Sequence, residues 1–332
     1  METVTSLKKN YYEGSPSIGF MGALPNPIKL PSARGSLMES LRELKDDPHV
    51  WSCVQSRKSG ALSAEWEIVG LHAEEITKAL EKIDMTAFFR DALEALLFGY
   101  QPIEIIWEKS GDGIYPAKLL AKPQEWFAFD AGREPVFLSR ANPSGEKIIP
   151  HKMIFARYEP SWRNPYGESL LAKCWLPAKF KRGATKFWAT FTEKYGMPIL
   201  TANFKRGATQ AEIETLAESL AKMAQDDVFV SPEDIEIELK EPQRGSSSEL
   251  YRELIKHANA EISKAILSQT LTTELDAGSY AAAQTHFKIR REVVEADCKL
   301  LEGVATELLR SIAALNFLGK DGAKLKFSLK KE

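Results

Sequence analysis

The stretch that decides the fold is SSSELYRELIKHANAEISKAILSQT (246–270), LTTELDAG (271–278) and SYAAAQTHFKIRREVVEADCKLL (279–301). Its first residues, from Ser246 to Glu249, have the form of a capping box, which predicts the start of a helix. Helical spacing resumes at Tyr280 and continues to Leu315. At about 1.5 Å per residue, the second helix could cross a whole domain, which favours a strut or a channel wall over a catalytic loop.

Each of these two helices is predicted to have one apolar face, because apolar residues recur at the helical period. On the first helix the stripe consists of Leu250, Leu254, Ala258, Ile262 and Ile266. On the second helix it consists of Val293, Val294, Leu300, Leu301, Val304, Leu308, Leu309 and Ile312.

A third long helix is predicted over residues 168–195, where an aromatic stripe that includes Phe187 alternates with Lys173, Lys181, Arg182 and Lys186. Pro177 should kink this helix or mark a second start. Basic residues among aromatic ones can bind nucleic acid, but helix packing with a solvated edge is the commoner explanation. Residues 197–245 then form a compact β-α-β-β insertion, in which Thr209 to Glu212 make a second capping box.

In the first half of the chain, the spacing of apolar residues changes several times between that of a helix and that of a strand. Residues 1–35 are rich in Gly, Pro and Ser but carry enough apolar residues to predict an arm that laces onto a neighbouring subunit. Asp47-Pro48 starts a helix to about Leu62, with Val50 and Val54 inward and Arg57 and Lys58 outward. A buried helix over 84–98 and short antiparallel strands from 101 to 157 follow, so the fold class is α+β.

Composition is that of an ordinary globular protein, with 332 residues, 44% apolar residues, 27% charged residues and a net charge of −2. This balance gives no overall argument for binding nucleic acid or an acidic membrane. Charge is nevertheless uneven. From Lys173 to Arg206 there are eight basic residues and one acidic residue, a net of +7, and from Glu212 to Glu249 there are eleven acidic residues and three basic ones, a net of −8.

No stretch predicts catalysis, a metal site or a cofactor site. Phosphate-loop, dinucleotide, nucleophile-elbow and zinc-protease motifs are missing. His257 and Glu261, like His286 and Arg290, are one helical turn apart, which is better explained by surface pairs than by acid–base chemistry. The cysteines, Cys53, Cys174 and Cys298, are too dispersed for a zinc site or a disulfide framework, and no signal peptide or membrane span is predicted.

Several long segments, in the same order, resemble the portal proteins of Mu-like tailed bacteriophages and prophages. They are LKDDPHVWSCVQSRKSGALSAEWEIV (44–69), FGYQPIEIIWE (98–108), PYGESLLAKCWLPAKFKRGATKFWATFTEKYGMPIL (165–200) and the run from Glu249 to Leu301. The resemblance covers roughly residues 36–318.

The resemblance implies the portal fold, with a mixed α/β wing, a two-helix stem, a small clip and a long helix behind a tunnel loop. On that template the parts are an N-terminal arm (1–35), wing (36–165), stem helix (166–196), clip (197–246), second stem helix (247–270), tunnel loop (271–278), long helix (279–315) and C-terminal strand (316–332). The family usually continues into a C-terminal crown, which is expected to be absent here.

The resemblance also implies a structural role without enzymatic activity. Portal subunits form a ring, usually of twelve, at one capsid vertex in the virion, and the ring assembles in the host cytoplasm. Double-stranded DNA passes through without sequence-specific binding, and the terminase large subunit, a head–tail adaptor, and capsid and scaffold proteins are the partners. No membrane partner is implied.

Three groups of residues become candidates on this template. The tunnel loop would present Thr272, Thr273, Glu274, Asp276 and Ser279 to DNA, the stem would carry Lys173, Lys181, Arg182 and Lys186, and the clip would offer its partners Glu212, Glu218, Asp226, Asp227, Glu233 and Asp234. Two alternatives stay open. One is a truncated or decayed relative that no longer assembles, and the other is a metal-dependent enzyme that processes nucleic acid.

Overall fold

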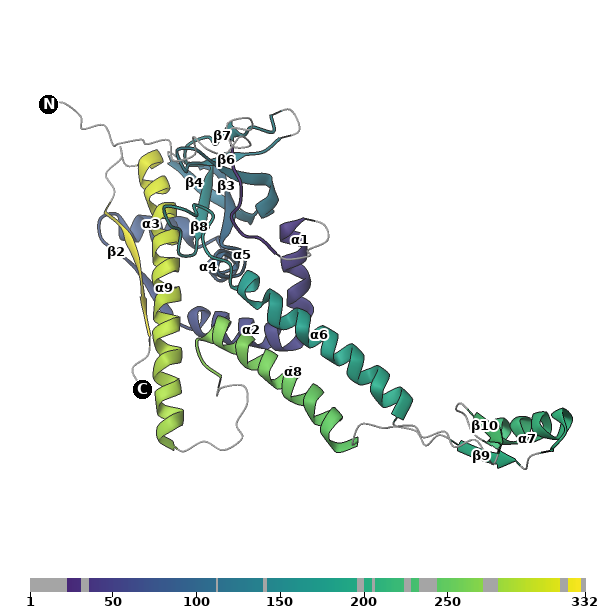
Figure 1. Cartoon of the computed structure of the whole chain (residues 1–332). Coiled ribbons are helices and arrows are strands. Elements are labelled where there is room, and N and C mark those ends of the chain that lie inside the picture. Colours follow the sequence, from purple (N-terminus) through teal and green to yellow (C-terminus); the bar gives the residue numbers. More distant parts are fainter. Residues whose placement is uncertain are drawn as a thin grey trace. The chain divides into compact units, whose positions relative to one another are not determined.

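The computed structural model of the chain describes residues 23–30, 36–111, 113–139, 142–195, 200–204, 207–223, 228–232, 244–270, 280–316 and 322–329 (Figure 1). The chain divides into two compact units, one formed by Met1–Trp175 with Glu261–Glu332 and the other by Leu176–Ala260. Two helices, α6 (Leu170–Tyr195) and α8 (Arg244–Leu267), contribute to both units. Helices and strands follow one another in the α+β order that the sequence predicts.

Capping side chains determine where the first two α-helices of the first unit begin. Ser36 Oγ accepts a hydrogen bond from the backbone N–H of Glu39, 3.2 Å away, at the start of α1 (Leu37–Arg42), which runs into the 3₁₀ helix η1 (Glu43–Asp46). Asp47 Oδ1 accepts from the backbone N–H groups of His49 and Val50 at the start of α2 (Pro48–Leu62). The helix predicted from Asp47-Pro48 is therefore confirmed.

The interior of the first unit corrects two expectations. Arg57 and Lys58 were expected to face solvent, but their exposed fractions are 6% and 5%. Each has a carboxylate partner far away in sequence, Asp297 for Arg57 and Glu94 for Lys58, which local periodicity cannot reveal. The helix predicted over 84–98 is divided at Leu93 into α4 (Met85–Ala92) and α5 (Glu94–Phe98). Another short helix, α3 (Ala73–Leu80), precedes them.

Three antiparallel sheets complete the described part of the first unit. Their strand orders are β4-β3-β8, β1-β5-β6-β7 and β11-β2. The first sheet contains β3 (Tyr100–Ser110), β4 (Gly113–Ala121) and β8 (Met153–Arg157). The second contains β1 (Ala23–Leu24), β5 (Phe127–Asp130), β6 (Pro135–Phe137) and β7 (Glu146–Lys147), and the third contains β2 (Glu65–Val69) and β11 (Lys324–Ser328). The 3₁₀ helix η2 (Gln124–Trp126) precedes β5.

The N-terminal arm is anchored on its own chain where the structure describes it. Ala23 and Leu24 pair antiparallel with β5, and Leu24 is buried. The backbone carbonyl of Leu24 accepts a hydrogen bond of 2.6 Å from the hydroxyl of Tyr166. Residues 23 and 24 of the predicted arm thus pair within their own chain, while residues 1–22 and 31–35 lie outside the described part and the contact with a neighbouring subunit stays a prediction.

The longest helix, α9 (Tyr280–Asn316), is present as predicted and packs against α2, α4, β4, β8 and β11. The predicted apolar face is buried at Val294, Leu301, Val304, Leu308, Leu309 and Ile312 and half-buried at Val293 and Leu300. The side chain of Asn316 ends the helix by exchanging two hydrogen bonds of 2.7 Å with the backbone of Ile114. This one helix therefore joins elements from both ends of the sequence.

The second unit contains β9 (Leu200–Phe204), α7 (Gln210–Met223) and β10 (Val228–Pro232) besides its share of α6 and α8. The two strands pair in parallel, so α7 is the crossover between them. The strand expected at 235–239 lies outside the described residues. The helix α8 begins at Arg244, so residues 246–249 lie inside it and do not start it, and Pro177 lies within α6 without dividing it.

Glu104 on the central strand β3 ties the first sheet together. Its carboxylate forms ion pairs with Lys122 at 2.8 Å, just after β4, and with Lys152 at 2.9 Å, just before β8. Hydrogen bonds from Lys122 and then Lys152 hold the pKa of Glu104 below its ordinary value. A depressed pKa means that the stabilisation is present above the unfolded-state pKa and is lost as pH falls through the folded-state value.

We therefore expect Glu104→Gln to lower the free energy of unfolding by about 1 kcal/mol at pH 6. The difference from wild type should shrink as pH falls below about 4.5, the ordinary value for this group. Urea unfolding at pH 6 and pH 3 measures both differences. Glu108→Gln, at an exposed position of the same strand, is the control, and an equal difference for Glu104→Gln at both pH values would contradict the assignment.

Candidate functional site

The candidate loop residues are flanked by described helices. Thr272, Thr273, Glu274, Asp276 and Ser279 lie outside the described residues. The preceding helix α8 ends at Leu267 and the following helix α9 begins at Tyr280. The structure therefore describes the helix ends on either side of the candidate loop residues.

The end of α8 is held by one face of α2. His49 Nε2 lies 2.8 Å from Ser263 Oγ, and Cys53 Sγ lies 3.7 Å from the same oxygen. Arg57 Nη1 donates a hydrogen bond of 2.6 Å to the backbone carbonyl of Ile266. The three α2 residues are four positions apart and so share one helix face. Sequence analysis missed this face, because its partners lie more than 200 positions away.

Arg57 also pairs with the long helix. Its Nε and Nη2 donate to the two carboxylate oxygens of Asp297 at 2.8 Å each, and its guanidinium lies 5.6 Å from the ring centre of Tyr158. Burial is the largest influence on the pKa of Arg57 and lowers it, but the hydrogen bonds and charges of Asp297 and Tyr158 together outweigh burial, so the pKa of Arg57 is raised. Burial likewise raises the pKa of the Asp297 carboxyl. The guanidinium is therefore a permanent cation.

The four basic residues of α6 do not form one face. At 3.6 residues per turn, Lys173 and Arg182 are about 180° apart around the helix, whereas Arg182 and Lys186 are about 40° apart. Lys173 forms an ion pair of 2.8 Å with Glu168. Arg182 and Lys186 are exposed and Lys181 is half-buried. Only Arg182 and Lys186 thus share a solvent-facing side.

Large apolar side chains are exposed along both long helices of the second unit. On α6, Leu176, Phe180 and Phe187 are 51%, 56% and 65% exposed and lie within about 40° of one another around the helix. On α8, Leu250 and Leu254 are 69% and 40% exposed. We call these five residues the exposed stripes.

The exposed stripes correct the burial expected from the sequence. The predicted α8 face is buried only in its second half, at Ala258, Ile262 and Ile266. The aromatic stripe of α6 is likewise divided, because Phe187 faces solvent while Phe191 packs against Tyr251 with ring centres 6.1 Å apart. Periodicity located the apolar faces but could not show which half of each face has a partner within the chain.

The acidic candidates are only partly described. Both the backbone N–H and the hydroxyl of Thr209 donate to Glu212 Oε2, at 2.8 and 2.9 Å, so the half of the predicted capping box in which Glu212 caps the N–H of Thr209 is confirmed. The backbone hydrogen bond from Thr209 is the main reason that the pKa of Glu212 is lowered. Glu218 is exposed on α7. The other four candidates, Asp226, Asp227, Glu233 and Asp234, lie outside the described residues.

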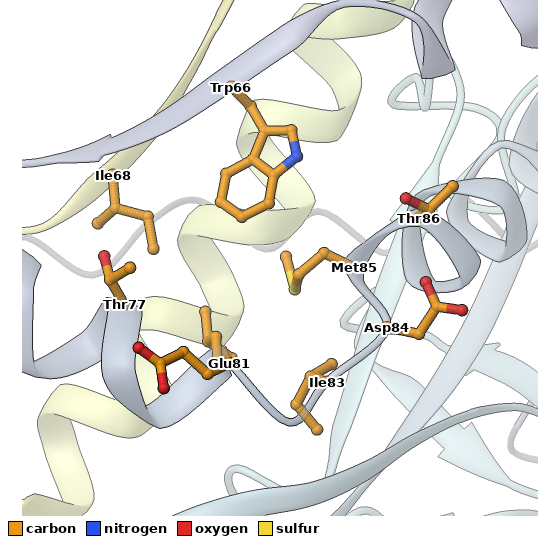
Figure 2. A pocket seen from close by; sticks show the side chains of 9 residues that line it. Trp66, Ile68, Thr77, Glu81, Ile83, Asp84, Met85 and Thr86 are labelled. Carbon is orange, nitrogen blue, oxygen red and sulfur yellow. The ribbon is translucent and has the colours of Figure 1, made fainter.

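Sequence analysis also missed a groove between β2 and the α3–α4 junction (Figure 2), with a volume of about 370 Å³. Trp66 and Ile68 of β2 face Ile83 and Met85 across it, and the polar lining consists of Thr77, Glu81, Asp84 and Thr86. The groove is thus apolar on the side of β2 and combines apolar and polar side chains on the side of α3 and α4.

The described residues also bear on metal and membrane binding. Within them, no group of three or more His, Cys, Asp or Glu side chains could hold a metal ion. The three cysteines are buried, and none of them forms a disulfide bond. A search of the described helices found none that is long and apolar enough to span a bilayer.

Comparison with known proteins gives matches over most of the chain. Residues 38–332 match the family described as "Portal protein of Mu bacteriophage". The chain is 26% identical to the Mu-like prophage FluMu protein gp29 of Haemophilus influenzae, with 92% of this chain and 62% of that protein covered. It is 27% identical to the portal protein of Escherichia phage Mu, with 81% and 55% covered. The chain thus spans about three fifths of the length of these relatives.

Solved structures show the same fold. A chain of the virion of a native gene transfer agent particle superposes with a TM-score of 0.62 at 14% identity, covering 92% of this chain and 87% of that one. An HK97 family phage portal protein from Corynebacterium diphtheriae superposes with a TM-score of 0.51 at 11% identity, covering 86% and 94%. At such identities, the likeness shows the fold alone.

Proposed function

The chain belongs to the family of portal proteins of Mu bacteriophage, and from this premise we propose that it is a structural portal subunit. Copies of the chain form a ring at one capsid vertex of the virion, after assembly in the host cytoplasm, and double-stranded DNA passes through the ring during packaging and ejection. The observation that carries the proposal is the family match over residues 38–332, on a fold shared with phage portal structures.

The exposed stripes support a ring. Each stripe gathers large exposed apolar side chains on one side of a helix, and apolar surface gathered in this way is typical of protein–protein interfaces. The five side chains from Leu176 to Leu254 lie on long helices, which provide a regular surface for a neighbouring copy. Covering them with a second chain removes apolar area from water, at about 25 cal/mol per Å².

The parts of the chain take portal roles in this proposal. Helices α6 and α8 form the stem, β9, α7 and β10 belong to the clip, and α9 is the long helix behind the tunnel loop. The clip meets the terminase large subunit and later a head–tail adaptor, while the ring contacts capsid and scaffold proteins. Catalysis has no part in this proposed function, because the role proposed for the chain is that of a structural portal subunit.

The first test is assembly. We expect the purified chain to form a ring of about twelve copies of the 37.2 kDa subunit, with a central hole. Phe187→Asp should abolish the ring, because it places a charge in the exposed stripe of α6, yet change the free energy of unfolding by no more than about 0.5 kcal/mol. Light scattering, negative-stain images and urea unfolding measure these properties.

The matched control for assembly is Ile149→Asp, because Ile149 is 71% exposed but lies in the first unit. This variant should assemble like wild type. Rings formed equally well by Phe187→Asp would remove the exposed stripe of α6 from the subunit interface.

The second test concerns the tunnel loop. Threonines and acidic residues suit a loop that lets DNA slide, whereas each added phosphate contact increases salt-sensitive affinity for DNA. The triple change of Thr272, Thr273 and Glu274 to Lys should therefore slow DNA movement, measured as nuclease-protected DNA per capsid over time. Unchanged packaging would exclude these residues from the bore.

A further inference from the structure

Strand β2 has one edge that no other described strand covers. Its sheet contains two strands in the order β11-β2, so β11 occupies the opposite edge. An edge strand presents a row of backbone N–H and C=O groups to which another extended chain can pair. Proteins often protect such edges with Lys, Pro or a β-bulge, but β2 (EWEIV) has neither residue type and its register with β11 is unbroken. We call the side of β2 away from β11 the free edge.

The groove between β2 and the α3–α4 junction lies beside this strand (Figure 2). Trp66 and Ile68, which alternate along β2 and therefore share one face, line the groove together with Ile83 and Met85. Its described lining includes no residue of β11. Trp66 is 38% exposed although its ring packs edge-to-face on Phe89, with ring centres 5.9 Å apart. The groove therefore offers apolar surface next to the inner face of β2.

The pairing with β11 shows which sequence pattern β2 accepts in a neighbouring strand. Phe327 lies opposite Trp66, and its ring centre is 5.2 Å from that of Phe89. Lys326 lies opposite Glu67, on the other face of the sheet. Opposite charges directly across a strand pair are stabilising, and so are apolar pairs. A suitable neighbour thus alternates apolar residues toward α4 with basic residues on the outer face.

Charge favours the same pattern at the free edge. The described lining of the groove contains two carboxylates, those of Glu81 and Asp84, and neither lysine nor arginine. Asp84 already accepts a hydrogen bond of 2.9 Å from the backbone N–H of Ala87. Glu67 and Glu81 form no ion pair with another described residue. Positive charge on an added strand would therefore meet carboxylates both on the outer face of β2 and at the groove.

We propose that the free edge of β2 binds an extended segment of a partner protein, in which apolar residues alternate with lysine or arginine. Such a segment adds a strand to β2, inserts its apolar side chains into the groove and places its basic side chains on the side of Glu67. Among the described strands of this chain, β11 has this pattern, and it already pairs with the opposite edge. The inference goes beyond the proposed portal function and does not depend on it.

The first experiment measures binding of a labelled eight-residue peptide of alternating Lys and Val, with blocked ends, to the full chain by fluorescence anisotropy. We expect saturable binding that is at least tenfold tighter than that of a Glu–Val peptide of the same length. The double variant Glu67→Lys with Glu81→Lys should reverse this preference, because it replaces the carboxylates by cations.

The matched control is the double variant Glu108→Lys with Glu134→Lys. Both residues are exposed in the first unit and neither lines the groove, so the change in net charge is the same. Its affinity for the Lys–Val peptide should differ from that of wild type by less than twofold. Urea midpoints of both double variants verify that the chain is folded.

Backbone pairing is tested with two isomers of the Lys–Val peptide, one N-methylated at every Val and the other at every Lys. In an added strand, the N–H groups of alternate residues point toward the neighbouring strand. One isomer should therefore bind at least tenfold more weakly than the other. Equal affinity of the two isomers would overturn the addition of a strand.

Three further outcomes would overturn the proposal. They are the absence of saturable binding to the wild-type chain, equal affinity for the Lys–Val and Glu–Val peptides, and an unchanged preference in the Glu67→Lys, Glu81→Lys variant. Binding by Phe187→Asp monomers without binding by wild-type rings would show that a second copy occupies the free edge, which contradicts its assignment to a partner protein.

Discussion

The first unit depends on one electrostatic constraint, which is that a buried guanidinium must be paired at each of its nitrogens. Arg57 meets this requirement with Asp297 and Ile266, so this one side chain links α2 to both α8 and α9. Removing one partner of such a pair typically costs about 3–5 kcal/mol, because a buried charge is left uncompensated. An apolar core would tolerate small shifts between these helices, whereas a bidentate pair with a helix-end contact accepts a single arrangement.

The sequence was sufficient wherever a structure is encoded locally. The starts of α2 and α7 follow from Asp47 and from Thr209 with Glu212, whose side chains cap backbone groups two or three residues away. The long helix α9 follows from its periodicity. Arg57 was placed on the wrong side of α2 because its partner is 240 positions away and only the tertiary fold brings Asp297 to it. The resemblance to portal proteins supplied the candidate loop, but the α2 face that supports it emerged only from the structure.

Along α8, the apolar side chains are exposed toward the start of the helix and buried toward its end. Ile262 and Ile266 are fully buried in the first unit, whereas Leu250, which lies about 120° from Ile262 around the helix, is 69% exposed in the second. A helix gains most of its stability from packing an apolar face and not from propensity. The exposed apolar residues of α8 therefore gain little from packing within the described residues, which is why the proposed ring places them against a neighbouring subunit.

The described cations of α6 form one short cluster and not a track along the whole helix. A face that grips the phosphate backbone requires aligned cations, because each neutralised phosphate contributes to affinity. Lys173 and Arg182 lie on opposite sides of the helix, and Lys173 is paired with Glu168. Lys179, Arg182 and Lys186 are exposed and lie within about 60° of one another, so they share one side of α6, while Lys205 and Arg206 of the same basic stretch follow the end of the helix. This cluster covers about two turns, so these described cations do not continue along the whole helix.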